Sequence, residues 1–119
     1  MKILGLSMNL HAKTELKKEA EIGLHEMRFV DTIDTMFEEI KTGKYSAVLI
    51  DETICSFLEL EAILLELNTL KKKTIAVVIG ESVTLKVVAG LIKAGAYDYL
   101  VKPIDGMQII KIIEKAIKS

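Results

Sequence analysis

The chain has 119 residues, half of them hydrophobic and 28% charged, and its acids and bases nearly cancel to a net charge of −1. This length and composition fit one domain with a substantial apolar core. The balanced charge gives no general attraction to nucleic acid or anionic membranes. The sequence contains no apolar run of about 18 residues, the length that spans a bilayer. The single cysteine, Cys55, cannot form an internal disulfide, which makes a reducing, cytoplasmic location the default expectation.

The predicted elements alternate between short apolar strands and helices with an apolar face. In chain order, we predict a strand at 2–6, a helix at 14–22, a strand at 27–30, a helix from a Thr32 cap to a stop at Gly43, a strand at 47–50, a helix at 58–70, a strand at 75–79, a helix at 83–94, a strand at 97–101 and a helix capped by Asp105. This alternation indicates an α/β fold of the flavodoxin-like type, with a doubly wound, five-stranded parallel sheet and five helices on its two faces. We expect one domain over residues 1–119.

Two charged side chains stand at the points where apolar strands end. Asp51 follows the continuous apolar run 47–50, and Lys102 follows the strand 97–101, immediately before the one proline of the chain, Pro103. In open α/β sheets, ligands and chemistry gather at the carboxyl ends of the strands. Asp51 and Lys102 are therefore candidates for a functional site at that edge of the sheet.

The stretch 95–103, with the sequence GAYDYLVKP, resembles the Gly-Ala-x-Asp-Tyr-Leu-x-Lys-Pro run of the receiver domain of bacterial response regulators, the CheY-like family. The resemblance covers the whole chain. It implies that Asp51 stands at the position that accepts phosphate from a histidine kinase, that Lys102 pairs with that phosphate and that Tyr99 is the switch aromatic. It also implies a cis peptide bond before Pro103 that directs Lys102 into the site. In such a site, Mg²⁺ and the lysine neutralise the phosphoryl oxygens while the carboxylate attacks.

Three positions depart from the family's pattern. The acidic pair that binds Mg²⁺ in the family falls on Ser7 and Met8, and a thioether is a poor ligand for a cation that prefers oxygen. The Thr or Ser that senses the phosphate falls on Gly80, which has no side chain to reach it, although Ser82 could substitute if the loop is shifted. We therefore expect weak or absent binding of Mg²⁺ and no other cofactor.

We interpret the chain as an atypical receiver, or pseudo-receiver, domain of a two-component response regulator or transcriptional regulator. We expect it to act as a protein-interaction module and not as an enzyme. Its expected partner is a histidine kinase or an output domain. We expect no direct contact with nucleic acid or membrane. One alternative is a phosphorylatable receiver that accepts phosphate on Asp51 with degraded metal affinity; another is that Asp51 only pairs with Lys102. A third is a small enzyme or ligand binder on the same fold, although residues 7–10 contain no glycine for a phosphate-binding loop.

The helix predicted at 83–94 has more apolar positions than one buried stripe needs. They are Val83, Leu85, Val87, Val88, Leu91 and Ile92. Receivers commonly dimerise or dock partners on the face formed by this helix, the strand after it and the last helix, so we expect an interaction surface there, either for a protein partner or for a second copy of the chain. The alternative is that the helix is well buried. Tyr99 borders this face, and its side chain could point inward or outward. Because Gly80 stands where the family has a hydroxyl residue that senses the phosphate, the position of Tyr99 should not depend on phosphate.

Cys55 and the two histidines give weaker signals. A lone cysteine in a loop is usually inert, with a redox thiol as the alternative. His11 and His25 are too far apart in sequence for a local metal motif, so we expect them to be solvated or structural.

Overall fold

The computed structural model describes residues 1–6, 8–70, 73–81 and 84–118, and within these ranges it contains five strands and five α-helices. The strands are β1 (Lys2–Leu6), β2 (Glu26–Val30), β3 (Ala47–Asp51), β4 (Ile75–Gly80) and β5 (Asp98–Val101). The helices are α1 (Leu10–Ile22), α2 (Ile33–Lys41), α3 (Phe57–Asn68), α4 (Leu85–Ala94) and α5 (Gly106–Lys118), with a short 3₁₀ turn, η1 (Glu52–Ile54), after β3.

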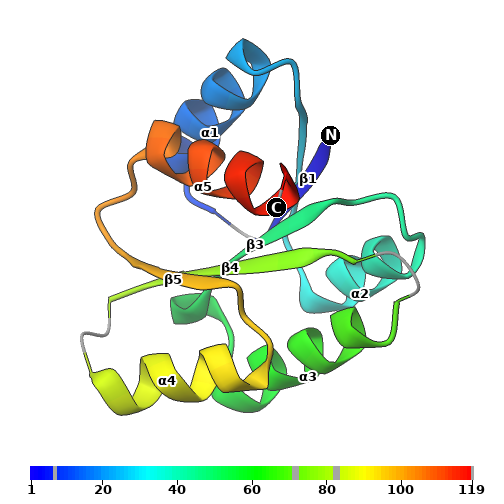
Figure 1. Cartoon of the computed structure of the whole chain (residues 1–119), viewed down its shortest axis with the longest axis vertical. Helices are drawn as coiled ribbons and strands as arrows, with labels where there is room; N and C mark the ends of the chain where they lie inside the picture. The colour runs from blue at the N-terminus through cyan, green and yellow to red at the C-terminus, as the bar shows by residue number, and fades with distance from the viewer. Residues whose placement is uncertain (7, 71–72, 82–83, 119) are drawn as a thin grey trace.

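All neighbouring strands pair in parallel, in the order β2-β1-β3-β4-β5. Helices α1 and α5 cover one face of the sheet, and α2, α3 and α4 cover the other (Figure 1). This arrangement confirms the predicted doubly wound, five-stranded α/β fold. Because every strand runs in the same direction, the carboxyl ends of β1, β3, β4 and β5 all lie at the same end of the sheet. This end is called the carboxyl edge below.

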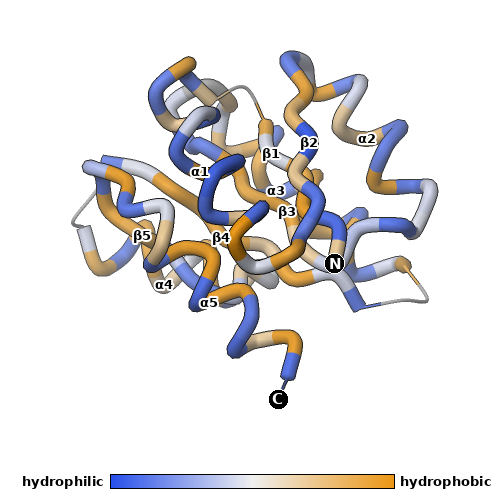
Figure 2. Tube along the Cα trace, turned by 90° about the horizontal axis from the view of Figure 1, so that it is seen from above, coloured by the Kyte–Doolittle hydropathy of each residue, from blue (hydrophilic) through white to orange (hydrophobic). Residues whose placement is uncertain are grey.

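The central strands are apolar along nearly their whole length because helices cover both faces of the sheet. All five residues of β3 and all six of β4 are buried. Figure 2 shows the same contrast along the trace, with hydrophobic residues concentrated in the central strands and many hydrophilic residues on the surrounding helices. Polar side chains on these strands can therefore reach solvent only where the strands end.

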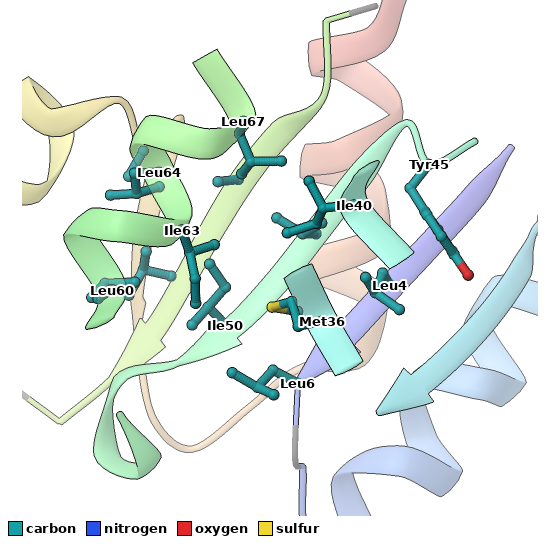
Figure 3. Packing of buried hydrophobic residues seen from close by; sticks show 14 of the residues in the cluster. Leu4, Leu6, Met36, Ile40, Tyr45, Ile50, Leu60, Ile63, Leu64 and Leu67 are labelled. Atoms are coloured by element: carbon teal, nitrogen blue, oxygen red, sulfur yellow. The ribbon is translucent and has the colours of Figure 1, made fainter. Parts of the chain in front are cut away.

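Two core clusters lie on the two faces of the sheet. On one face, Met36 and Ile40 of α2 and Ile63 of α3 pack with Leu4 and Ile50 of the strands (Figure 3). On the other face, apolar side chains of α1 and α5 pack against the strands. The spacing of three or four residues between apolar positions gives each helix the stripe that it buries.

Side-chain caps fix the start of several helices. The Asn9 side chain accepts a hydrogen bond from the Ala12 N–H (2.9 Å) at the start of α1, and Thr32 caps α2 in the same way, as predicted. Ser56 and Glu59 form a capping box at the start of α3. Each cap satisfies backbone N–H groups that have no partner within the helix.

The start of α5 is capped from another element. The Gly106 N–H donates to Oε1 of Glu15 in α1 (2.9 Å), and a carboxylate is favourable at the positive end of a helix. A Cβ at residue 106 would lie 2.8 Å from Cγ of Glu15, so this close approach requires glycine. Asp105 acts as the predicted cap by accepting from the Gln108 N–H (3.2 Å). The chain segment after β5 is thus fastened to α1.

The structure corrects some of the predicted bounds. Helix α1 begins at Leu10 and not at residue 14, because the cap at Asn9 starts it earlier. Helix α4 begins at Leu85, and the predicted member Val83 lies outside the described residues. Every strand agrees with its predicted range to within one residue at each end. Across the described ranges, no helix has both the length and the apolar character needed to cross a bilayer.

Candidate functional site

Asp51 and Lys102 meet at the carboxyl edge of the sheet. Asp51 is the last residue of β3 and Lys102 directly follows β5, so they lie on either side of β4. The Lys102 N–H donates to the carbonyl of Gly80 (2.8 Å), and Lys102 Nζ lies 2.7 Å from Asp51 Oδ2. The peptide bond between Lys102 and Pro103 is cis, the isomer that the resemblance implies. The structure thus brings together the two charged residues selected from the strand ends.

Both carboxylate oxygens of Asp51 are engaged. Oδ2 pairs with Lys102, and Oδ1 accepts from the Thr53 N–H (2.9 Å) and the Thr53 hydroxyl (2.6 Å). Burial by itself raises the pKa of the Asp51 carboxyl, but the hydrogen bonds from Lys102 and Thr53 outweigh it and hold the pKa below its usual value. Asp51 is therefore ionised near neutral pH, and the charge of Lys102 balances it.

Thr53 is a site residue that the sequence reasoning missed. The turn η1 follows β3 directly and returns Thr53 to Asp51, whose side chain accepts from the backbone N–H two residues later, as in an Asx turn. Lys102 Nζ also lies 3.5 Å from the Thr53 hydroxyl oxygen, so the three side chains form a closed network. The available signal was an aspartate at a strand end with a hydroxyl residue two positions on.

On the β1 side of the sheet, the described residue nearest to the end of the strand lies in the hydrophobic core. Met8 is only 4% exposed and belongs to the core cluster that contains Ala12 and Leu16 of α1. Ser7, the other position of the expected acidic pair, lies outside the described residues. The next polar residue, Asn9, uses its side-chain oxygen to cap α1. No carboxylate therefore comes from positions 8 and 9.

The resemblance implies a magnesium ion at this edge, but the side chains described here do not fit one. A hard divalent cation takes several oxygen ligands, usually with carboxylates among them. Both oxygens of Asp51 already hold donors, and Met8 offers a buried thioether. Among the residues that the structure describes, no group of three or more His, Cys, Asp or Glu side chains is placed to hold a metal ion. Among the side chains that the structure describes, none of these positions adds a second carboxylate beside Asp51 for such a cation.

The β4 side of Asp51 is closed by polar atoms. Tyr99 is 8% exposed, and its hydroxyl donates to Oε1 of Glu52 (2.5 Å). A Cβ at Gly80, the last residue of β4, would collide with the Glu52 carboxylate and the Tyr99 hydroxyl oxygen. These two polar groups therefore occupy the space that a side chain at residue 80 would fill. Tyr99 points inward, and Ser82, the suggested substitute for a hydroxyl, lies outside the described residues.

Cys55 and the histidines take part in structural contacts. Burial raises the pKa of the half-buried Cys55 thiol to about 11, helped by nearby carboxylates, so the thiol is protonated and a poor nucleophile at neutral pH. His11 is exposed on α1. His25 lies beside the start of β2, where its Nε2 is 2.7 Å from Oε2 of Glu114 in α5. The two histidines therefore have different carboxylate partners, Glu15 for His11 (3.9 Å) and Glu114 for His25.

No protein-family model matches the sequence, and no curated protein is significantly similar to it. The structure resembles that of an atypical orphan response regulator with a TM-score of 0.84 at 14% identity, over 99% of this chain and 96% of that one. A response regulator from Thermotoga maritima gives 0.82 at 19% identity, over 99% and 98% of the two chains. The receiver domain of the Francisella response regulator 1452 gives 0.82 at 19%, over 98% and 96%. The chain therefore has the fold of response regulator receiver domains.

Proposed function

We propose that this chain is an atypical receiver domain that signals through protein–protein contacts in the cytoplasm, with weak or absent Mg²⁺-dependent phosphorylation of Asp51. The fold supports the receiver part of this proposal, as do Asp51 and Lys102 at the carboxyl edge. The observation that carries the atypical part is the burial of Met8 at a position where the receiver pattern has a metal-binding acid. Enzymatic phosphoryl transfer depends on positioning and charge neutralisation, and a site without the acidic pair loses much of the cation's contribution.

The state of the carboxyl edge is consistent with signalling that needs no phosphate. Asp51 is charge-balanced by Lys102 and hydrogen-bonded to Thr53 in the unmodified chain. One structural neighbour, an atypical orphan response regulator, is described as having a phosphorylation-independent regulatory mechanism. We extend that mode of regulation to this chain as part of the proposal.

The test of this proposal is a titration with Mg²⁺ followed by a small phosphodonor. We expect millimolar Mg²⁺ to leave the amide resonances of Asp51 and Thr53 nearly unchanged, because the carboxylate oxygens are already engaged. Incubation with acetyl phosphate should then add a phosphoryl group to little or none of the protein, as measured by intact-protein mass spectrometry. The Asp51→Asn variant is the control. A substantial phosphoryl adduct on the wild type that grows with Mg²⁺ and that this control lacks would contradict the proposal.

A second candidate function is a phosphorylatable receiver with degraded metal affinity. The observation in its favour is that Asp51 is ionised and lies 2.7 Å from Lys102, so the nucleophile and one neutralising charge are both in place. This candidate predicts an Asp51-dependent adduct whose yield rises steeply with Mg²⁺ concentration. The same experiment thus separates the two functions by the response to the cation.

We assign the protein contact to the face made by α4, β5 and α5. Large apolar side chains are exposed on these elements at Leu85, Ile92, Val101 and Met107. Val87 and Val88, which the sequence pattern grouped with them, are partly buried against the core and suit the surface less well. A histidine kinase, an output domain or a second copy of the chain would cover this face, because exposed apolar side chains that lie together mark a contact site.

Sedimentation velocity of the wild type and two matched variants tests the homodimer. Leu85 on α4 is 80% exposed and Leu58 on α3 is 76% exposed, so changing either to Glu should leave the fold intact. We expect Leu85→Glu to weaken self-association at high concentration and Leu58→Glu to leave it unchanged. A wild type that stays monomeric, or equal effects of the two variants, would show that the homodimer contact is assigned wrongly.

A further inference from the structure

We propose that Glu52 is a latch that holds Tyr99 inside the domain, in the space left by Gly80, without any phosphoryl group. The inference rests on the proposed function for one point only, that the position of Tyr99 matters to a partner. Its physical content concerns the side chains of Glu52 and Tyr99 and the missing side chain of Gly80. None of these three residues contributes to the Asp51–Lys102 ion pair itself.

The first support is the hydrogen bond between the two side chains. Tyr99 is buried, and a buried phenol needs a partner for its hydroxyl. The Glu52 carboxylate accepts that hydrogen bond at 2.5 Å, although the two residues lie 47 positions apart in the sequence. A carboxylate acceptor makes such a bond stronger than a neutral acceptor does. The contact therefore favours the inward orientation of the Tyr99 ring over an orientation in which the hydroxyl is solvated.

The second support is steric. A Cβ at Gly80 would collide with Oε1 and Cδ of Glu52 and with the Tyr99 hydroxyl oxygen. The backbone of Gly80 is also fixed, because its carbonyl accepts from the Lys102 N–H (2.8 Å) and it lies in register with Val101. A side chain at residue 80 and the Glu52–Tyr99 contact therefore exclude each other. Gly80 supplies the room, and the Glu52 carboxylate with the Tyr99 hydroxyl fills it.

The third support is the anchoring of the turn that carries Glu52. Thr53, the next residue, donates two hydrogen bonds to Asp51, which fix η1 against the end of β3. The backbone of Glu52 is held in this turn, and its side chain reaches Tyr99 on β5. The latch consequently needs no ligand to form. We infer that the face bordered by Tyr99 has one preset shape in the unmodified chain, which a protein partner would recognise directly.

Fluorine NMR of the whole chain labelled with 3-fluorotyrosine tests the latch, because the chain has only three tyrosines, each assignable by a Tyr→Phe change. The difference in chemical shift between light and heavy water reports the exposure of each ring. In the wild type, Tyr97 (46% exposed) should show a large difference, and Tyr45 (3%) and Tyr99 (8%) small ones. In Glu52→Ala, the Tyr99 difference should approach that of Tyr97, whereas Glu52→Gln, which keeps an acceptor, should retain most of the protection.

A second tyrosine–glutamate pair supplies the matched control. The Tyr45 hydroxyl donates to Oε2 of Glu39 (3.0 Å), far from Gly80 in the sequence. Glu39→Ala should move the Tyr45 resonance and leave that of Tyr99 unchanged. If Tyr99 stays protected in Glu52→Ala, contacts other than the one to Glu52 hold the ring and the latch is disproved. This readout uses neither Mg²⁺, phosphodonor nor partner, so its failure is distinguishable from failure of the proposed function.

A double-mutant comparison tests the steric part. Gly80→Thr should expose the Tyr99 ring and lower the urea midpoint of unfolding, because the new side chain displaces the Glu52 carboxylate. Adding Glu52→Ala removes the colliding group, so the double variant should recover part of the lost midpoint. If the loss of midpoint in the double variant equals the sum of the losses in the two single variants, the proposal is overturned, because such additivity is expected of residues that do not interact. If Gly80→Thr alone does not fold, recovery of a folded double variant supports the latch, and its failure to fold counts against it.

Discussion

The two sides of Asp51 differ from the receiver pattern in opposite ways. On the β1 side, the position of a metal-binding acid holds Met8, whose side chain belongs to the apolar core. On the β4 side, the position of a hydroxyl residue holds Gly80, and the vacated space contains the Glu52 carboxylate and the Tyr99 hydroxyl. One position is thus buried in hydrocarbon, and the other adjoins a polar contact.

This difference predicts how readily each side would accept the side chain that the receiver pattern has there. Restoring an acid on the β1 side would require charge to enter a packed apolar cluster, which is costly without a partner for that charge. Placing a hydroxyl residue on the β4 side would require the ends of the Glu52 and Tyr99 side chains to move out of that space. We therefore expect the β1 side to resist change much more strongly than the β4 side.

The largest effect is expected from Met8→Asp. Met8 is 4% exposed, and replacing it removes buried methylene groups and introduces a charge, so the free energy of unfolding should fall by at least about 3 kcal/mol. Met8→Leu, which nearly conserves volume, should cost less than about 1.5 kcal/mol. Urea unfolding followed by circular dichroism measures both values. Wild-type stability of Met8→Asp would mean that the β1 side is open to solvent and that the contrast between the two sides is wrong.

The second-largest effect is expected from removing the cation that balances the Asp51 carboxylate. Lys102→Met leaves the Asp51 carboxylate without its cation, and the free energy of unfolding at neutral pH should fall by about 1–3 kcal/mol. Because the folded-state pKa of Asp51 lies below its ordinary value of 3.8, the stability that it contributes is present above that value and is lost as the pH falls through the folded-state pKa. The difference between wild type and variant should therefore shrink in acid.

Urea unfolding at several pH values measures this dependence. Lys111→Met on α5 is a suitable control, because it removes an exposed lysine that makes no described ion pair with Asp51. A difference between wild type and Lys102→Met that stays constant from neutral to strongly acidic pH would assign the loss to packing and not to the Asp51 charge.

The smallest of the three effects is expected from Thr53→Val. This change removes the hydroxyl bond to Asp51 Oδ1 but keeps the backbone bond from the same residue, so the free energy of unfolding should fall by about 1 kcal/mol. The pKa of Asp51, followed by carbon NMR of its carboxyl group, should rise. Thr69→Val at the end of α3 is the comparison, since its hydroxyl donates to the Glu66 carbonyl and lies on another element. An unchanged Asp51 titration in Thr53→Val would remove Thr53 from the site.

The sheet and the Asp51–Lys102 pair could be predicted because their signals are local. Continuous apolar runs mark buried strands, and a charged residue directly after such a run must lie at the edge of the sheet. Helix starts were less predictable, as Asn9 shows, because a cap depends on one hydrogen bond and not on a periodic pattern. The predicted strand bounds therefore agree better with the structure than the predicted helix starts do.

Glu52 and Thr53 were missed for a different reason. They lie on a single 3₁₀ turn, where no periodicity assigns a side chain to a face. The partner of Glu52 is Tyr99, which is distant in sequence, and the contact exists only because Gly80 on the strand between them has no side chain. A contact that depends on an absent group leaves no motif in the sequence. The orientation of Tyr99 stayed open for the same reason.

The hydrogen bond that the Gly106 N–H donates to Glu15 of α1 also restricts the backbone freedom of the segment that carries Lys102. The segment that carries this lysine is tied at one end to the Gly80 carbonyl and at the other, through Gly106, to α1. Ordering a flexible backbone costs about 1–2 kcal/mol per residue, and here folding has already removed that freedom. An anion that displaced the Asp51 carboxylate from Lys102 would meet a preorganised cation. Its affinity would depend on the exchange of one negative group for another and hardly at all on ordering the chain.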